Sequence, residues 1–337
     1  MPTEFGFNGL GAVVYYRSYS RLKDNGEQET WADTIIRVVE GILSVRKWWY
    51  VTNRLHWDEQ KWQKIGTRMA YAMHQRRFMP GGRGLFATGS SYWRERGSAS
   101  SYNCSAVSIT DNLSKPTDLV ADMLLNGVGV GYDTHRATFK MKQPSEESTV
   151  FQVPDTREGW AAAFATLVAS YEKGSATVEF DYSLIRPEGA PIHGLGGTAS
   201  GYLPLEASLE QCRTQLDKHI KGEIGRAELI TDVMNLIGRA VMVAGTRRSA
   251  LISLGSPSDD EFINLKNYDL KPERAAWGFQ SNNSVVLEKI EDFQRIPDIA
   301  QNVINEGEPG FLNLMNIQKY GRYGDVMPDA ATLCNPK

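Results

Sequence analysis

The chain has 337 residues, of which 41% are hydrophobic and 23% are charged, and its formal net charge is −3. This composition is typical of a globular protein of about two domains, and it excludes wholesale disorder and collagen-like or coiled-coil repeats. The acidic balance argues against duplex DNA binding, so we expect no direct nucleic-acid partner. The sequence has no apolar run of membrane-spanning length and no basic-then-apolar start, and its three cysteines make no secreted disulfide framework. We therefore expect a soluble, cytoplasmic protein with no membrane partner.

The first hundred residues are rich in Trp, Arg, Lys and Tyr, and their apolar residues recur at helical spacing. Trp31, Ile35 and Val38 fit one face of a helix that continues to Ile42. A second helix is predicted over 58–73, and the Pro-Gly cluster that follows ends the pattern. We predict a helical N-terminal region over residues 1–97.

From residue 98 onward, short β-like runs alternate with amphipathic stretches. Strands are predicted at 106–109, 176–180, 249–254 and 283–287, helices at 115–126, 156–170 and 229–243, and a polar surface loop at 142–149. Alternating helices and strands indicate an α/β fold with a mainly parallel sheet, here assigned to residues 98–337.

Three glycine-rich turns punctuate this second region, at 127–131, 194–201 and 245–249. Bare turns let backbone N–H groups approach phosphate oxygens, and Arg247 and Arg248 would add positive charge. The alternative is tight strand-to-helix turns without a ligand. The first turn lacks the dinucleotide fingerprint spacing, and no Gly-Lys-Ser/Thr follows as in a P-loop. Three such turns in one α/β region favour a site for nucleotide phosphates.

Cys104 stands immediately before the first predicted strand. It is either an inert buried cysteine or a redox thiol, and a redox thiol would need access and a second thiol in space. The polar run at 281–284 is either a turn that caps a strand or a set of ligand contacts. None of the cysteines or histidines has metal-ligand spacing, so no metal site is predicted.

Taken together and in order, these segments resemble the large catalytic chain of ribonucleotide reductases. The resemblance is strongest to the adenosylcobalamin-dependent (class II) type, in particular to its monomeric ribonucleoside-triphosphate reductases. The matching segments are 16–21, Asn103-Cys104, 127–132, 154–160, Ile185-Arg186-Pro187-Glu188-Gly189-Ala190-Pro191-Ile192-His193-Gly194, 196–201, 235–238, Arg247-Arg248-Ser249-Ala250, 281–285, Gly307-Glu308-Pro309-Gly310 and Asn335-Pro336.

The resemblance implies an N-terminal helical region followed by the first half of a ten-stranded α/β barrel, with a finger loop that starts near the end of this chain. It implies an oxidoreductase that converts ribonucleoside tri- or diphosphates into 2′-deoxyribonucleotides by thiyl-radical chemistry with adenosylcobalamin. The implied partners are the ribonucleotide substrate, a deoxynucleotide or ATP effector and a thioredoxin-type reductant.

The resemblance also assigns roles to single residues. Cys104 matches the first reducing cysteine, and Asn335 matches an asparagine that hydrogen-bonds the ribose. The implied substrate-binding residues are Asn103, Gly129, Gly131, Ser281 and Asn282. The implied specificity loop consists of Gly245, Thr246, Arg247, Arg248 and Ser249. The implied effector-binding residues are Asp111, Leu113, His193, Gly196 and Gly197.

One departure from the family pattern bears on function. The family's catalytic motif is Asn-Pro-Cys-Gly-Glu, whereas this sequence reads Asn335-Pro336-Lys337. We therefore expect the chain to be an N-terminal half that is active only with a C-terminal half, which would hold most of the cobalamin site. A split gene, an intein or a truncated sequence would each produce this arrangement. The alternative function is a nucleotide-binding effector fragment without catalysis.

Overall fold

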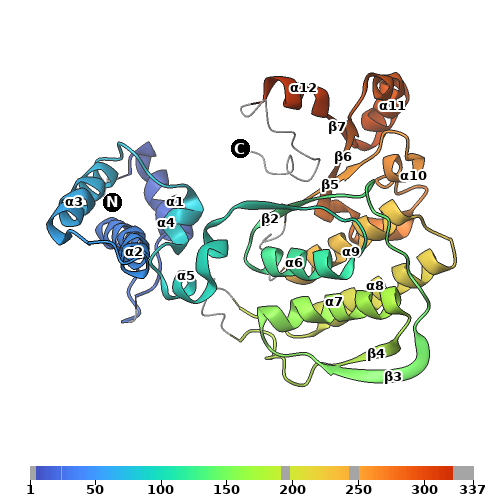
Figure 1. Cartoon of the computed structure of the whole chain (residues 1–337), viewed down its shortest axis with the longest axis horizontal. Coiled ribbons are helices and arrows are strands. Elements are labelled where there is room, and N and C mark those ends of the chain that lie inside the picture. Colours follow the sequence, from blue (N-terminus) through green and yellow to red (C-terminus); the bar gives the residue numbers. More distant parts are fainter. Residues whose placement is uncertain (1–4, 24, 191–197, 243–249, 322–337) are drawn as a thin grey trace. The chain divides into compact units, whose positions relative to one another are not determined.

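The computed structural model describes residues 5–23, 25–190, 198–242 and 250–321 (Figure 1). The chain divides into two compact units, residues 1–103 and residues 104–337. The sequence-based domain boundary after residue 97 stays a prediction.

The first unit is helical. Its elements are η1 (Phe7–Gly9), α1 (Leu10–Ser18), α2 (Trp31–Thr52), α3 (Glu59–His74), α4 (Gly82–Ala87), α5 (Ser91–Arg96) and η2 (Gly97–Ser101). Helix α2 begins after Thr30 because its hydroxyl accepts from the Asp33 N–H while the Asp33 carboxylate accepts from the Thr30 N–H. Asp58 caps α3 in a similar way through the Lys61 N–H. Both predicted helices are confirmed, and α2 extends ten residues beyond Ile42.

The core of this unit lies where α1, α2, α3 and α4 meet. Its buried residues are Tyr15, Trp31, Ile35, Val38, Val39, Met73 and Leu85. Helix α2 also passes very close to the turn after α4, since a Cβ built on Gly41 would lie 2.7 Å from the Cα of Gly89. Gly89 has a φ of +79°, so glycine is needed on both sides of this contact.

The second unit is α/β. Its larger elements are β1 (Cys104–Val107), α6 (Ser114–Leu125), β2 (Gly129–Asp133), β3 (Ser145–Gln152), α7 (Arg157–Lys173), β4 (Ala176–Asp181), α8 (Leu203–Ile220), α9 (Arg226–Val241), β5 (Leu251–Gly255), β6 (Ser281–Leu287), α11 (Ile296–Glu306), β7 (Gly310–Asn313) and α12 (Leu314–Tyr320). Shorter elements are α10 (Asp260–Ile263), η3 (Pro272–Ala276), η4 (Gly278–Gln280) and η5 (Ile290–Arg295).

Five of these strands form one sheet in the order β1-β2-β5-β6-β7, and every neighbouring pair is parallel. The predicted α/β class with a mainly parallel sheet is therefore confirmed. The first strand begins at Cys104 rather than at Ala106, so the cysteine belongs to the sheet itself.

The predicted loop at 142–149 is wrong, because residues from Ser145 onward form β3, which pairs in parallel with β4. Almost every residue of β3 is exposed. A strand with polar side chains on both faces has no apolar alternation, so the sequence pattern could not identify it.

Helices cover one face of the five-stranded sheet. Figure 1 shows α6 and α9 beside the sheet, α7 and α8 in the next layer, and β3 and β4 beyond them. Helix α9 is buried on nearly all sides and carries much of the large apolar core. In the part of the chain that the structure describes, no helix is both long and apolar enough to cross a membrane.

Candidate functional site

The side of the sheet away from α6 and α9 is called here the second face. Side chains alternate between the two faces along a strand, and residues paired across parallel strands point to the same side. The small apolar cluster on this face contains Leu254, Val286 and Leu314, with Ala106, Ile252 and Leu312 packed against it.

Cys104 lies on the second face, at the N-terminal end of β1. It is two residues from Ala106 on the same strand and pairs with Gly129 of β2. The thiol is free and half-buried. Gly131 pairs with Ala106 on one side and with Ile252 on the other. The two glycines therefore leave bare backbone beside the cysteine, where a ligand can approach the sheet closely.

Asn282 lies on the same face of the sheet. It pairs with Ile252, which itself pairs with Gly131, so its side chain also points to the second face, and it is exposed. The register thus places Cys104, Gly129, Gly131 and Asn282 on one side of one sheet, near the N-terminal ends of β1, β2 and β6. Of the predicted substrate residues, these are the ones that the structure brings together with the cysteine.

The backbone around Asn282 is held by an ion pair between the buried Lys266 and the partly buried Glu308. Lys266 Nζ donates to the carbonyl oxygens of Ser281 (2.6 Å) and Gly278 (2.7 Å) and lies 3.4 Å from Glu308 Oε2. Glu308 Oε2 accepts from the Asn283 N–H at 2.8 Å. The peptide groups on both sides of Asn282 are therefore bonded to one Lys–Glu pair.

The Lys266–Glu308 pair supplies hydrogen-bond partners to the part of β6 that β7 does not reach. β7 begins at Gly310, which pairs with Ser284, so the first residues of β6 extend past the start of β7. Their backbone groups would otherwise lack partners on that side, and buried backbone groups require partners. The sequence motifs include Glu308 without a role and do not include Lys266, and no spacing pattern predicts that the two side chains pair.

Ser281 lies on the other face of the sheet, because it neighbours Asn282 on the same strand. It is fully buried, and its hydroxyl donates to Asn283 Oδ1 at 2.8 Å. Its side chain is therefore committed inside the protein, on the side away from Cys104.

The covered face is backed by a buried ionic network between α9 and η3. Asp232 Oδ1 accepts from Arg274 Nε and Trp277 Nε1, each at 2.8 Å, and both charged side chains are almost fully buried. Burial raises the pKa of Asp232 above its ordinary value, although Arg274 acts in the opposite direction. Lys271 pairs with Glu228 beside this network.

The predicted effector residues Asp111 and Leu113 lie before the N-terminus of α6. Asp111 is exposed, and its pKa is lowered by hydrogen bonds from its own backbone N–H and from Thr110 and Asn112. The helix start itself is already occupied by a carboxylate: Glu172 accepts from the N–H groups of Leu113 and Ser114 and from the Ser114 hydroxyl.

Several predicted residues lie outside the described part of the chain. They are His193, Gly196, Gly197, Asn335 and the whole specificity loop at 245–249. Asn103, which is exposed, is the last residue of the first unit and directly precedes Cys104 in the sequence.

Asp133, which sequence reasoning did not single out, ends β2 on the second face. It is fully buried, its Oδ2 accepts from the Ser108 hydroxyl at 3.1 Å, and its Oδ1 has no hydrogen-bond partner within the described part of the chain. Burial raises its pKa above the ordinary value. Three residues of β2 separate it from Gly129, so it lies at the opposite end of the strand from Cys104.

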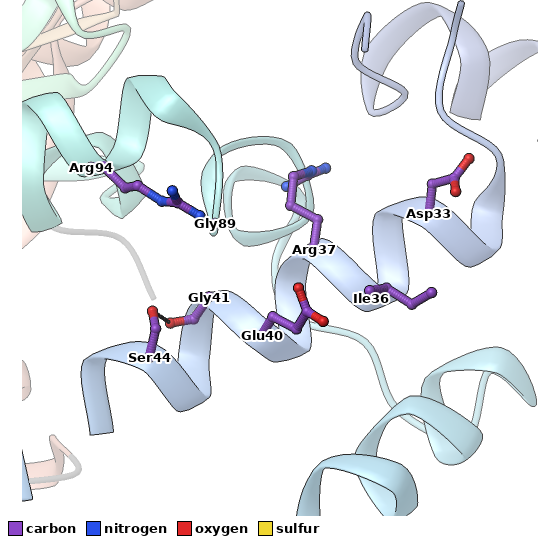
Figure 2. Close-up of a pocket in the computed structure, with 8 residues that line it drawn as sticks. All are labelled: Asp33, Ile36, Arg37, Glu40, Gly41, Ser44, Gly89 and Arg94. Atoms are coloured by element: carbon purple, nitrogen blue, oxygen red, sulfur yellow. Dashed lines mark hydrogen bonds between the residues drawn. The ribbon is translucent and has the colours of Figure 1, made fainter. Parts of the chain in front are cut away.

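The helical unit has a polar pocket of its own, with a volume of about 430 Å³. Figure 2 shows its lining residues, Asp33, Ile36, Arg37, Glu40, Gly41, Ser44, Gly89 and Arg94. Arg37 is committed to Glu29 and to the carbonyl oxygens of Leu85 and Thr88. Nothing in this lining matches a residue that the sequence motifs single out.

No cluster of three or more His, Cys, Asp or Glu side chains able to hold a metal ion occurs among the described residues. The prediction of no metal ligands in this chain stays a prediction, since part of the chain is not described.

Two family models match the sequence. Residues 1–90 match the ribonucleotide reductase alpha domain, and residues 126–216 match the insertion domain of B12-dependent ribonucleotide reductase.

Individual proteins match over almost the whole chain. An adenosylcobalamin-dependent ribonucleoside-triphosphate reductase from Euglena gracilis is 40% identical, with 94% of this chain and 44% of that protein covered. A probable enzyme of the same name from Dictyostelium discoideum is 37% identical with the same coverage. The Lactobacillus leichmannii reductase is 30% identical, with 94% and 50% covered. The chain thus spans about half the length of the curated relatives it matches.

A solved structure also matches. A B12-dependent (class II) ribonucleotide reductase superposes with a TM-score of 0.76 at 28% identity, covering 90% of this chain and 49% of that one. Sequence and fold together therefore make the chain a homologue of the ribonucleotide reductases, with a helical region and part of the α/β barrel. Within them, its matches are to the adenosylcobalamin-dependent, class II type, as the sequence motifs predict.

Proposed function

We propose that this chain is the N-terminal half of an adenosylcobalamin-dependent ribonucleoside-triphosphate reductase. The whole protein would reduce ribonucleoside tri- or diphosphates to 2′-deoxyribonucleotides and so supply precursors for DNA replication. The observation that carries the proposal is the row Cys104, Gly129, Gly131 and Asn282 on the second face of the sheet. It combines a reducing thiol, bare backbone and a polar amide on one surface.

Cys104 is proposed as the first reducing cysteine. Loss of the ribose 2′-hydroxyl as water needs two electrons, and two thiols supply them when they join as a disulfide. Cys104 is one thiol, and the second would come from the part of the relatives that this chain does not span. A thioredoxin-type reductant would then return the disulfide to two thiols.

Gly129 and Gly131 are proposed to let the sugar lie against the backbone, with Asn282 as a side-chain contact. Since the Ser281 hydroxyl is committed to Asn283, any contribution of Ser281 to substrate binding would come from its backbone. Asn103 and Asn335 remain proposed substrate contacts on the resemblance alone.

Control by a deoxynucleotide or ATP effector is proposed for Asp111, Leu113, His193, Gly196 and Gly197, with the loop at 245–249 reading the effector's identity. Because Glu172 already occupies the start of α6, effector phosphates would have to bind elsewhere than this helix terminus.

The cofactor proposal is adenosylcobalamin, which supplies the radical chemistry when bound. Following the resemblance, we propose that most of its binding site lies in the part of the relatives that this chain does not span. A cytoplasmic location is proposed with the rest of the function.

The test is a chimera that joins residues 1–337 to the part of the Euglena gracilis relative that this chain does not span. With adenosylcobalamin and a dithiol, we expect ribonucleoside triphosphate to become deoxynucleotide. Cys104→Ser should lower turnover by about a thousandfold or more, since serine cannot form the disulfide. Cys212→Ala, which removes a buried thiol from α8, is the matched control and should retain activity.

Two results would contradict the proposal. One is an inactive chimera that nevertheless folds and binds effector nucleotide, which would favour the effector-fragment alternative. The other is a Cys104→Ser chimera with unchanged turnover.

A further inference from the structure

The helices α2 and α3 carry an unusual concentration of basic and aromatic residues around their connecting turn. Residues 45–77 contain eight Lys or Arg and only two acidic residues, together with six Trp or Tyr, in a chain whose net charge is −3. The proposed reductase function uses none of these residues.

The basic residues of α3 form a stripe. Lys61, Lys64, Arg68 and Tyr71 follow one another at intervals of three and four residues, which places them on one side of the helix. All four are exposed, whereas Gly66 and Met73 face the core on the opposite side. From Lys61 to Tyr71 the stripe runs about 15 Å along the helix axis.

The positive charges of this stripe have no carboxylate partner among the described residues. In the described part of the chain, Lys61, Lys64 and Arg68 form no ion pair, and neither does Arg46 at the end of α2. Lys47 is different, since it pairs with Glu59 at 2.9 Å. The unpaired cations are free to bind a negatively charged ligand.

Aromatic rings lie among these cations. The Arg46 guanidinium lies over the rings of Trp49 and Trp62, 5.4 and 5.6 Å from their centroids. Lys61 Nζ lies 5.8 Å from the Trp62 centroid. Trp49 on α2 is 43% exposed, and Tyr71 at the C-terminal end of the stripe is 58% exposed. The surface therefore offers both cations and accessible ring faces.

We infer that this α2–α3 surface, made of Arg46, Trp49, Lys61, Lys64, Arg68 and Tyr71, binds single-stranded nucleic acid. A line of cations suits a phosphate backbone, and exposed rings suit unpaired bases, which stack on aromatic side chains without regard to sequence. Duplex DNA hides its bases and lacks this second interaction.

The composition of the stripe disfavours two other polyanionic partners. The exposed residues beside the cations on α3 are Gln60, Gln63 and Thr67, so this helix exposes no apolar face that could insert into a lipid surface. An acidic peptide would satisfy the charges but would offer no planar groups to the rings.

This inference departs from the expectation of no direct nucleic-acid partner. That expectation rested on the net charge of the whole chain, which averages a basic helical pair with acidic segments elsewhere. The inference does not depend on the reductase proposal, because the surface lies within the first unit.

The experiment uses the 337-residue chain with fluorescently labelled (dT)20 and U20, followed by anisotropy at several salt concentrations. We expect saturable binding to at least one oligonucleotide. The logarithm of the binding constant should fall linearly with the logarithm of the salt concentration. The two oligonucleotides distinguish DNA from RNA as the preferred strand.

Two variants separate the ionic and stacking contributions. Lys61→Ala/Lys64→Ala/Arg68→Ala should weaken binding about 30-fold or more at low salt and reduce the salt slope by about 2. Tyr71→Ala should weaken binding about fivefold or more with an unchanged slope, because stacking releases no counterions. The matched control, Lys140→Ala/Lys142→Ala/Lys173→Ala, removes three exposed lysines of the second unit and should bind like the parent.

The inference is overturned if neither oligonucleotide binds at low salt, or if the α3 triple variant and its control lose the same affinity. It is also overturned if poly-glutamate or anionic phospholipid vesicles bind the chain as tightly as the oligonucleotides, since that would show a surface selective only for charge.

Discussion

Each unit of this protein contains a buried arginine–carboxylate contact, Arg37–Glu29 in the first and Arg274–Asp232 in the second, and the two acids differ in how they titrate. In the helical unit, Arg37 Nε lies 2.6 Å from Glu29 Oε1, and the Glu29 side chain is 8% exposed. In the α/β unit, Arg274 Nη2 lies 2.7 Å from Asp232 Oδ1, and the Asp232 side chain is fully buried.

Burial disfavours the ionised form of both acids, but it outweighs the opposing contacts only for Asp232. For Glu29, the hydrogen bonds and charge of Arg37, with the Thr34 hydroxyl, outweigh burial and hold the pKa below its ordinary value. For Asp232, burial outweighs Arg274 and Trp277, and the pKa is raised. The same kind of ion pair can therefore lower or raise the pKa of its acid, depending on how deeply the acid is buried. With deeper burial, the cost of desolvating the carboxylate exceeds the stabilisation from the arginine and the hydrogen bonds.

The largest effect is expected from breaking the deeper pair. Arg274→Met should leave Asp232 buried without its cation and cost the second unit about 3–5 kcal/mol in the free energy of unfolding. Denaturant titration, with hydrogen exchange of α9 to assign the unit, measures this loss. Arg274→Met/Asp232→Leu is the control and should lose clearly less, because it leaves no unpaired charge. Equal losses would show that packing, not charge, dominates at this site.

The shallower pair should give a smaller effect with a definite pH dependence. Glu29→Gln should cost the helical unit about 2 kcal/mol at neutral pH, as charged hydrogen bonds become neutral. Since the folded-state pKa of Glu29 is lowered, its stabilisation is present above the unfolded value of 4.5 and is lost as pH falls through the folded value. The free energy of unfolding of the parent should therefore fall more steeply on acidification than that of the variant.

The opposite sign is expected in the second unit. Because the pKa of Asp232 is raised, its contribution favours folding at low pH and is lost as pH rises through the folded-state value. Parallel pH profiles for the two units, followed by hydrogen exchange in each, would contradict the comparison.

The smallest effect is local to the proposed site. Lys266→Met removes the cation that bonds the Ser281 and Gly278 carbonyls, so exchange at the Asn283 amide should accelerate about tenfold. Lys271→Met removes a cation paired with Glu228 on another element and should leave this amide protected. If both variants accelerate exchange at the Asn283 amide equally, the Lys266–Glu308 pair does not hold the start of β6.

Local signals in the sequence predict the helices well. Thr30, Asp58 and Thr156 are N-caps in the structure, and each stands where the amphipathic pattern begins. The parallel sheet follows from the alternation of strands with such helices. The sequence does not predict β3, because its largely polar residues show neither the helical nor the strand periodicity of apolar positions.

The candidate site depends on information that no local pattern contains. Motif resemblance identifies Cys104, Gly129 and Asn282, but only the register between strands shows that they share a face and that Ser281 does not. Lys266 and Glu308 are 42 residues apart and meet only because the chain between them forms β6 and α11. Asp133 is missed for a related reason, since its burial is a property of the packed sheet.

The most direct test of the account concerns the chemical fate of one thiol. The chimera should be given one equivalent of ribonucleoside triphosphate with adenosylcobalamin and no external reductant, then alkylated and mapped by mass spectrometry. The account predicts that deoxynucleotide forms while Cys104 enters a disulfide and Cys212 stays a free thiol. Deoxynucleotide formed with Cys104 still fully alkylated would contradict it.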